Sequence, residues 1–127
     1  LAIAAALTSP NPVIASDIDP VAVDVARANA AANGVADRVR CLEAAGFEHP
    51  EITAGAPYDL IFANILKGPL VELAPEMRAH LGEGGRIVLS GLLADQAAEV
   101  IDAYAAQGLR CRREAILGEW ATLTLSP

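Results

Sequence analysis

Two polar residues of this chain stand where an α/β protein places groups that bind ligands. Asp17 ends an apolar run that begins at residue 13, and Asn64 directly follows the apolar run 60–63. Ligands of open α/β sheets bind beyond the carboxyl ends of the strands, so we expect both side chains at a binding edge. A carboxylate there accepts hydrogen bonds from a ribose diol, and an amide orients a polar group without removing its proton. The pair predicts a nucleoside site with an orienting group beside it.

Each residue also has a plainer interpretation as a helix cap. Asparagine and aspartate side chains commonly accept hydrogen bonds from the first free amides of a helix. Asn64 lies shortly before Pro69, a typical first-turn residue, and Asp17 lies shortly before the Asp19-Pro20 pair. Asp19 is the better candidate for the second cap. The sequence alone leaves the capping and ligand-binding interpretations open for both Asn64 and Asp17.

Strand and helix patterns alternate along the chain and supply the elements that hold these residues. Strand patterns cover residues 13–17, 39–43, 60–63 and 86–90, and helical patterns cover 1–7, 20–33, 69–81 and 93–107. The uninterrupted run 60–63 predicts a strand buried on both faces, and residues 44–57 predict a loop because Gly and Pro interrupt them. Residues 109–117 and 120–125 predict a terminal antiparallel hairpin. The order predicts the α/β class with a mainly parallel sheet.

Length and charge narrow the class of protein. The 127 residues suit one small domain, and 54% of them are hydrophobic. The net charge of −7 argues against a nonspecific nucleic-acid binder, which needs a basic face. No apolar run approaches the roughly 20 residues that span a membrane. Cys41 and Cys111 form no disulfide framework, which fits a cytoplasmic protein. His49 and His80 have no partners at metal-ligand spacing, so no metal site is expected.

Longer motifs, taken in order, resemble a known family. They are Leu1 to Leu7, Ser16-Asp17-Ile18-Asp19-Pro20, Ala28-Asn29-Ala30-Ala31-Ala32-Asn33-Gly34, Ala63-Asn64-Ile65-Leu66, Leu73-Ala74-Pro75, Gly84-Gly85-Arg86, Leu89-Ser90-Gly91-Leu92 and Gly118-Glu119-Trp120. Together they are similar to the catalytic domain of the bacterial methyltransferase of ribosomal protein L-eleven, the PrmA type. Asn-Ile-Leu followed by Gly-Pro-Leu is the most specific of them.

The resemblance implies a fold, a cofactor and a substrate. The fold would be the seven-stranded, Rossmann-like class I methyltransferase fold, and the cofactor S-adenosylmethionine. The activity would be methylation of lysine and N-terminal amines of a large-subunit ribosomal protein. By motif, Asp17 would bind the cofactor ribose, Ile18 would pack by the adenine, and Asn64 would lie near the methionine end of the cofactor and the target amine. Ile65 and Leu66 would shape the substrate entrance through their carbonyls.

The chain departs from the family pattern at its front. The family has a first strand and a glycine-rich loop just before Leu1, whereas the first glycine here is Gly34. We therefore expect residues 1–127 to be a partial catalytic domain, with an acidic residue and Gly-x-Gly-x-Gly encoded upstream. That family strand lies between the strands at residues 13 and 60, so each should lack one ladder partner. The alternatives are an inactive remnant that only pairs with another chain, and a dinucleotide-dependent oxidoreductase.

Overall fold

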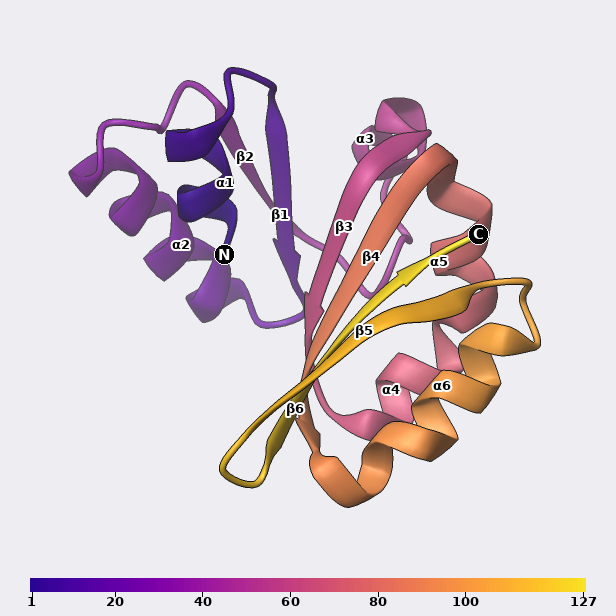
Figure 1. Cartoon of the computed structure of the whole chain (residues 1–127). Helices are drawn as coiled ribbons and strands as arrows, with labels where there is room; N and C mark the ends of the chain where they lie inside the picture. The colour runs from indigo at the N-terminus through magenta and orange to yellow at the C-terminus, as the bar shows by residue number, and fades with distance from the viewer. The chain divides into compact units, whose positions relative to one another are not determined.

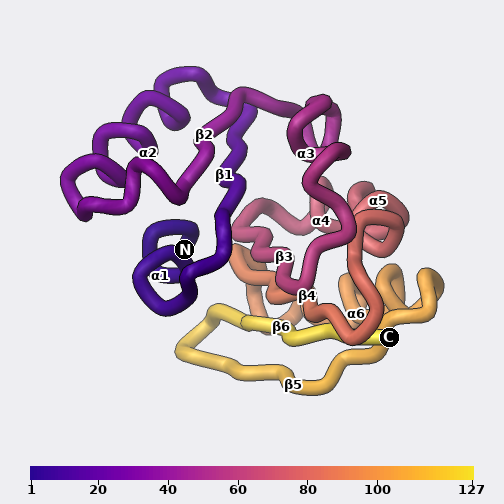
Figure 2. The backbone as a smooth tube through the Cα atoms, turned by 90° about the horizontal axis from the view of Figure 1, so that it is seen from above, coloured from indigo at the N-terminus to yellow at the C-terminus, as the bar shows by residue number.

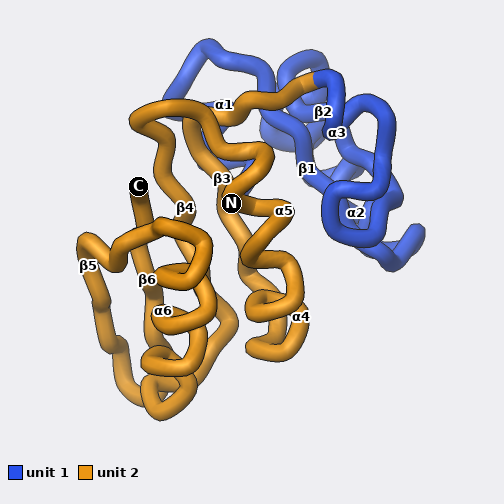
Figure 3. The backbone as a smooth tube through the Cα atoms, turned by 90° about the vertical axis from the view of Figure 1, so that its right-hand side faces the viewer, with its two compact units in different colours: residues 1–54 blue, residues 55–127 orange.

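A computed structural model describes all residues from 1 to 127, and the chain divides into two compact units (Figure 3). The first unit is Leu1–Ala54 and the second is Gly55–Pro127. Each has its own sheet, of two strands in the first unit and four in the second. None of the helices is long and apolar enough to cross a membrane.

The first unit packs helices against a pair of parallel strands. Its elements are α1 (Ala2–Thr8), β1 (Val13–Asp17), α2 (Pro20–Ala32), β2 (Val39–Glu43) and α3 (Pro50–Gly55). Helices α1 and α2 lie on the same side of the two strands (Figures 1 and 2). Their small residues enclose a core made of Ala6, Val23, Ala30, Val35, Val39 and Cys41. Alanine-rich helices can approach the strands closely, which lets so small a unit bury a core.

The start of α2 follows the sequence prediction. The Asp19 carboxylate accepts a hydrogen bond from the Val21 amide at 2.8 Å, and Pro20 occupies the first helical position. Gly34, just past the helix end, has a φ of +69°, a conformation that glycine adopts without steric cost. These local signals fix where α2 begins and ends, and so where β1 gives way to the helix.

The loop predicted for residues 44–57 is wrong over its second half, where α3 forms. Its start at Pro50 is compatible with a helix, because the first turn does not need the missing proline amide. His49 Nδ1 accepts from the Glu51 amide at 3.1 Å, and Ile52 is only 5% exposed. The Glu51 carboxylate also takes two hydrogen bonds from Arg40, at 2.8 and 2.9 Å. Proline was the misleading signal, since it opens this helix and does not break it.

The second unit covers one face of a four-stranded sheet with helices. Its elements are β3 (Tyr58–Asn64), α4 (Lys67–Glu72), α5 (Ala74–His80), β4 (Leu81–Leu93), η1 (Ala94–Gln96), α6 (Ala97–Ala105), β5 (Arg110–Leu117) and β6 (Trp120–Ser126). The strand order is β3-β4-β6-β5, and α4, α5 and α6 lie on one side of the sheet (Figure 1). The largest buried side chains there are Leu70, Ile87, Leu89, Leu92, Val100, Tyr104, Leu109, Leu123 and Leu125.

Strand pairing confirms part of the sequence prediction and corrects part. The terminal antiparallel hairpin is present as β5 and β6. The two-stranded sheet, β1–β2, is parallel. In the four-stranded sheet β3–β4 is parallel while β4–β6 and β5–β6 are antiparallel, so that sheet is mixed rather than mainly parallel. β1 pairs only with β2, and β3 pairs only with β4. Each of the two strands that should lack a ladder partner is therefore an edge strand in its sheet.

Two further predictions are wrong. The strand at residues 60–63 is not buried on both faces, because β3 is an edge strand and the helices of its unit cover one face; Leu60 is 46% exposed and Phe62 39%. The single helix predicted for residues 69–81 is two helices, α4 and α5, separated at Leu73. Pro75 explains the break, because it lacks an amide and its ring interferes with the preceding turn.

Tyr104 links α6 to α4 inside the second unit, and its removal should measurably destabilise the fold. The completely buried hydroxyl donates to the Leu70 carbonyl at 2.9 Å and lies 3.1 Å from the Met77 sulfur. Tyr104→Phe keeps the ring but removes the donor, so we expect a loss of about 1 kcal/mol in unfolding free energy. Urea denaturation of the two proteins measures this, and equal unfolding free energies would contradict it.

The same side chain gives a pH signature. Burial raises the pKa of Tyr104 above that of an exposed phenol, so the folded state favours the protonated form. The stabilisation is fully present below the unfolded pKa of about 10 and is lost as pH rises further. The stability difference between wild type and Tyr104→Phe should therefore shrink above that pH.

Candidate active site

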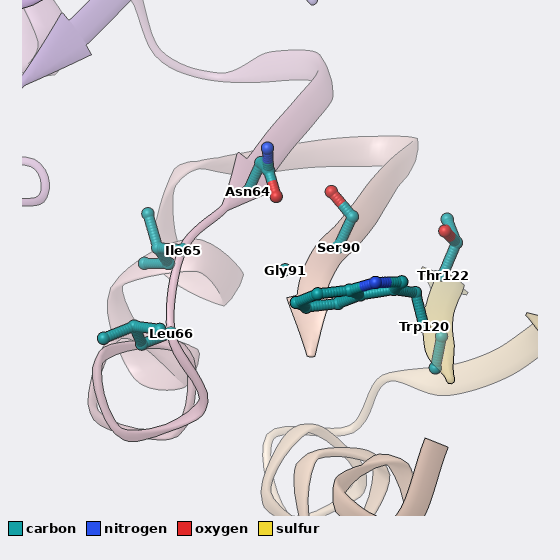
Figure 4. A pocket seen from close by; sticks show the side chains of 8 residues that line it. Asn64, Ile65, Leu66, Ser90, Gly91, Trp120 and Thr122 are labelled. Carbon is teal, nitrogen blue, oxygen red and sulfur yellow. The ribbon is translucent and has the colours of Figure 1, made fainter. Parts of the chain in front are cut away.

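A pocket of about 550 Å³ opens at the carboxyl ends of β3 and β4, within the second unit (Figure 4). Asn64 is the last residue of β3 and lies opposite Ser90 of β4 in the parallel register. The lining residues come from the ends of three strands and from the segment before α4; they are Asn64, Ile65, Leu66, Ser90, Gly91, Trp120, Ala121 and Thr122. The sequence-predicted residues Asn64, Ile65 and Leu66 thus share one cavity.

The Asn64 side chain is free to bind a ligand. Helix α4 has Leu66 as its N-cap and no side-chain cap hydrogen bond, so the capping interpretation of Asn64 is wrong. The residue is exposed, and its amide makes no hydrogen bond within the chain. Figure 4 shows the amide pointing toward the space beside the Ser90 hydroxyl. An amide in that position offers one acceptor and two donors to whatever enters.

Gly91 lets two backbone segments approach each other beneath this amide. Its φ is +82°, and a Cβ built there would lie 2.8 Å from Asn64 Oδ1, 2.8 Å from the Ile65 carbonyl oxygen and 3.0 Å from the Ile65 nitrogen. Any side chain at this position would push against both Asn64 and the Ile65 backbone. Gly91 is therefore required by conformation and by space, and its absence of a side chain helps define the position of Asn64.

No side chain that lines the pocket is an acid or a base. The polar side-chain groups are one amide, two hydroxyls and the indole N–H, and the other walls are aliphatic, aromatic or glycine. The arrangement can hold and orient a polar group, but it has no residue that could withdraw a proton at neutral pH. The chain also has no group of three or more His, Cys, Asp or Glu residues arranged to hold a metal ion.

Asp17 lies in the first unit, at the carboxyl end of β1. Its Oδ1 accepts from the Asp19 amide at 2.9 Å, while Oδ2 makes no hydrogen bond in the structure. The α2 cap is Asp19, so Asp17 is not the helix cap. In the parallel register Asp17 lies opposite Glu43, the last residue of β2, and Ile18 beside it is 72% exposed. Two exposed carboxylates and an exposed aliphatic side chain therefore gather at this strand edge.

Asp17 and Asn64 end strands of different sheets, one in each unit. The expectation that both residues lie at one edge of a single sheet is therefore wrong, because β1 and β3 belong to different sheets. Lys67, the first residue of α4, pairs with Glu99 at 2.6 Å and joins α4 to α6.

Sequence reasoning gave no role to Ser90, Gly91, Trp120 or Thr122. Their signal was present but weak, since a Ser-Gly pair closes the apolar run 86–90 in the same way that Asn64 closes 60–63. Trp120 could not be assigned to the pocket without the antiparallel register, which brings the start of β6 to the end of β4.

The comparisons with known proteins agree with one another. The model of the ribosomal protein L11 methyltransferase (PrmA) family matches residues 1–126. A ribosomal protein L11 methyltransferase of Brucella abortus (strain S19) is 48% identical over 126 residues, which are 99% of this chain and 44% of that protein. One from Mesorhizobium japonicum is 50% identical over 98% of this chain and 43% of its own length. The chain thus spans less than half the length of these relatives.

Solved structures extend the agreement to the fold. The ribosomal protein L11 methylase of Lactobacillus delbrueckii subsp. bulgaricus superposes with a TM-score of 0.90 at 30% identity, covering 98% of this chain and 62% of that one. An RNA methyltransferase of Salinibacter ruber, solved in complex with S-adenosyl-L-homocysteine, gives a TM-score of 0.70 at 23% identity over 97% and 70% of the two chains. The second similarity concerns the fold alone.

Proposed function

Because this chain belongs to the ribosomal protein L11 methyltransferase (PrmA) family, we propose that it is part of the catalytic domain of a protein N-methyltransferase. The fold is that of class I methyltransferases. The proposed methyl donor is S-adenosylmethionine, and the proposed acceptors are lysine or N-terminal amines of a large-subunit ribosomal protein. The cytoplasm, where ribosomes work, is the proposed location. The proposed domain comprises residues 1–127 as one part of a longer catalytic domain.

The observation that carries the proposal is the pocket around Asn64. Methyl transfer to an amine needs alignment of the reacting atoms more than it needs an acid or a base. An orienting amide in a cavity without ionisable side chains supplies alignment. The alternative of a dinucleotide-dependent oxidoreductase gains no support from this pocket or from the family match. An inactive remnant remains the competing hypothesis, and it is distinguished by whether methyl groups are transferred.

The residues of the first unit fit the proposed cofactor. A ribose diol needs an acceptor, and the unengaged Oδ2 of Asp17 can accept from it, as carboxylates at this position do in nucleotide-binding α/β folds. Exposed Ile18 next to it offers an apolar surface for the adenine. Glu43, opposite Asp17 in the register, is a further acceptor at the same strand edge.

The chain's own residues would act on the amine as follows. When bound, S-adenosylmethionine supplies a methyl group on a sulfonium that is open to in-line displacement. Asn64 Oδ1 accepts a hydrogen bond from the amine, and the Ile65 carbonyl supplies a further acceptor at the entrance. Together they aim the nitrogen lone pair. The Leu66 carbonyl already accepts from the Leu70 amide at 3.1 Å in the first turn of α4, so Leu66 contributes its apolar side chain. The proton of the incoming amine leaves to solvent, because no basic side chain lines the pocket.

Cofactor binding by Asp17 is the first test of this function. Asp17→Ala in the full-length protein should weaken S-adenosylmethionine binding about tenfold or more, since a charge-assisted hydrogen bond is worth ~1.5–3 kcal/mol. Isothermal titration calorimetry measures the affinity. Asp24→Ala is the control, because Asp24 is an exposed carboxylate on α2 paired only with Arg27. Unchanged affinity in a folded Asp17→Ala protein would remove the ribose role, and no cofactor binding by wild type would contradict the proposed function.

A further inference from the structure

Trp120 is the one tryptophan of the chain, and it is unusually accessible for so large an aromatic side chain. Its relative exposure is 59%, although it is the first residue of β6 and pairs with both β4 and β5. The hairpin does not bury the ring, so the ring contributes little to the core of the second unit. An exposed indole at the mouth of a cavity is available to a ligand.

The ring forms one wall of the pocket that contains Asn64. Figure 4 shows the indole extending from β6 across the end of β4, seen almost edge-on, with one face turned toward Ser90 and Asn64. No carboxylate lines this cavity. A positively charged group inside it would therefore meet the indole face and the amide oxygen of Asn64, and no counter-ion. Exposed Ile65 and Leu66 form an aliphatic wall at the same opening.

We propose that the face of Trp120 holds the methylated ammonium of the acceptor side chain, opposite Asn64, through a cation–π interaction. This inference rests on the proposed function and deepens it by assigning the pocket to alkylammonium groups. An aromatic face attracts an ammonium whose hydrogens have been replaced by methyl groups, whereas hydrogen-bond acceptors lose their partners. Ile65 and Leu66 receive the aliphatic stem of a lysine-type side chain.

The charge appears at the right stage of the reaction for such a contact. As the amine lone pair forms the C–N bond, the C–S bond breaks and its electron pair stays on sulfur. The positive charge thus moves from sulfur to nitrogen. The nitrogen then releases a proton to water before it can accept another methyl group. An indole face stabilises the nitrogen charge as it forms and retains the methylated product between transfers.

The natural fluorescence of Trp120, taken as the difference between the full-length protein and its Trp120→Phe variant, tests the contact. Nε-trimethyllysine amide is the probe, and its neutral isostere, with carbon in place of the quaternary nitrogen, is the control ligand. Saturable quenching by the cation is expected, with binding about three- to tenfold tighter than that of the isostere. The N-methyl protons should also shift upfield in the NMR spectrum, as protons above an aromatic face do.

Substitutions of Trp120 distinguish a cation–π contact with the ring face from a general apolar contact. Trp120→Phe should keep part of the upfield shift and the preference for the cation, whereas Trp120→Leu should lose both. Ile116→Ala is the matched control, because Ile116 is an exposed apolar residue of the same hairpin that does not line the pocket. It should behave as wild type. Thermal melts of each variant verify that the hairpin remains folded.

Three results would overturn the inference. They are equal affinity for the cation and its isostere, no upfield shift of the methyl protons, and an unchanged preference in a folded Trp120→Leu protein. None of these depends on methyl transfer. Absence of transfer in the full-length protein would instead contradict the proposed function, so the two failures are distinguishable.

Discussion

Asn64→Ala is expected to lower the single-turnover rate of methyl transfer by about a hundredfold or more, while cofactor affinity changes much less. The amide ends β3, makes no hydrogen bond within the chain and faces a cavity without ionisable side chains. Its contribution is therefore the alignment of the amine, which affects the chemical step. Rapid-quench measurement of methyl incorporation, with calorimetry of cofactor binding alongside, separates the two effects.

Two further variants test whether a loss of rate in Asn64→Ala comes from the missing amide. Asn64→Asp keeps the size but loses the two amide donors, so it should also be slow. Asp59→Ala changes an exposed residue of the same strand, far from its carboxyl end, and should retain the wild-type rate. Near-normal transfer by Asn64→Ala would contradict the orienting role and leave the pocket without its central residue.

Gly91→Ala should reduce transfer by a similar factor and also destabilise the protein by about 1–3 kcal/mol, the usual range for a strained backbone position. The φ of +82° opposes any side chain, and the new Cβ would lie 2.8 Å from both Asn64 Oδ1 and the Ile65 carbonyl oxygen. The Ile65 backbone cannot move away from the new Cβ unless the segment that carries Leu66 also moves. Misplacement of Asn64 then follows from a change at a neighbouring residue that has no functional group of its own.

Gly108→Ala is a matched control for that experiment. Gly108 has nearly the same φ, +78°, but a Cβ there would have no atom within 4 Å. Both substitutions therefore introduce backbone strain, and only the one at Gly91 disturbs the pocket. Denaturant unfolding should show both proteins destabilised, whereas transfer kinetics should show a loss in Gly91→Ala alone. Equal activity of the two variants would show that the close approach at Gly91 has no role in positioning Asn64.

The sequence predicted those helix and strand bounds that depend on neighbouring residues, such as caps, turn residues and short apolar runs. The Asp19-Pro20 pair and Gly34 bounded α2, and the run at residues 39–43 gave β2 with the bounds that the structure has. Asn64, Ile65 and Leu66 were correctly expected at one strand end, because a strand followed by a turn places consecutive residues together.

What the sequence did not predict depends on long-range pairing. The apolar run at residues 60–63 is compatible with a central or an edge strand, and only the sheet order shows that β3 is an edge strand with Leu60 exposed. Trp120 joins the pocket through an antiparallel register set fifty-odd residues beyond Asn64 in the chain. The sequence shows Gly91 as a glycine after a strand pattern. Its close approach to the Ile65 backbone depends on the tertiary structure, which the sequence does not show.

Mass spectrometry of the methyl acceptor tests the central claim most directly. The purified large-subunit ribosomal protein is incubated with S-adenosylmethionine and the full-length protein, either wild type or Asn64→Ala, and its amines are mapped. We expect wild type to add methyl groups to lysine or N-terminal amines, and Asn64→Ala to add almost none in the same time while still binding the cofactor. An acceptor left unmodified by a folded, cofactor-binding wild-type protein would contradict the account.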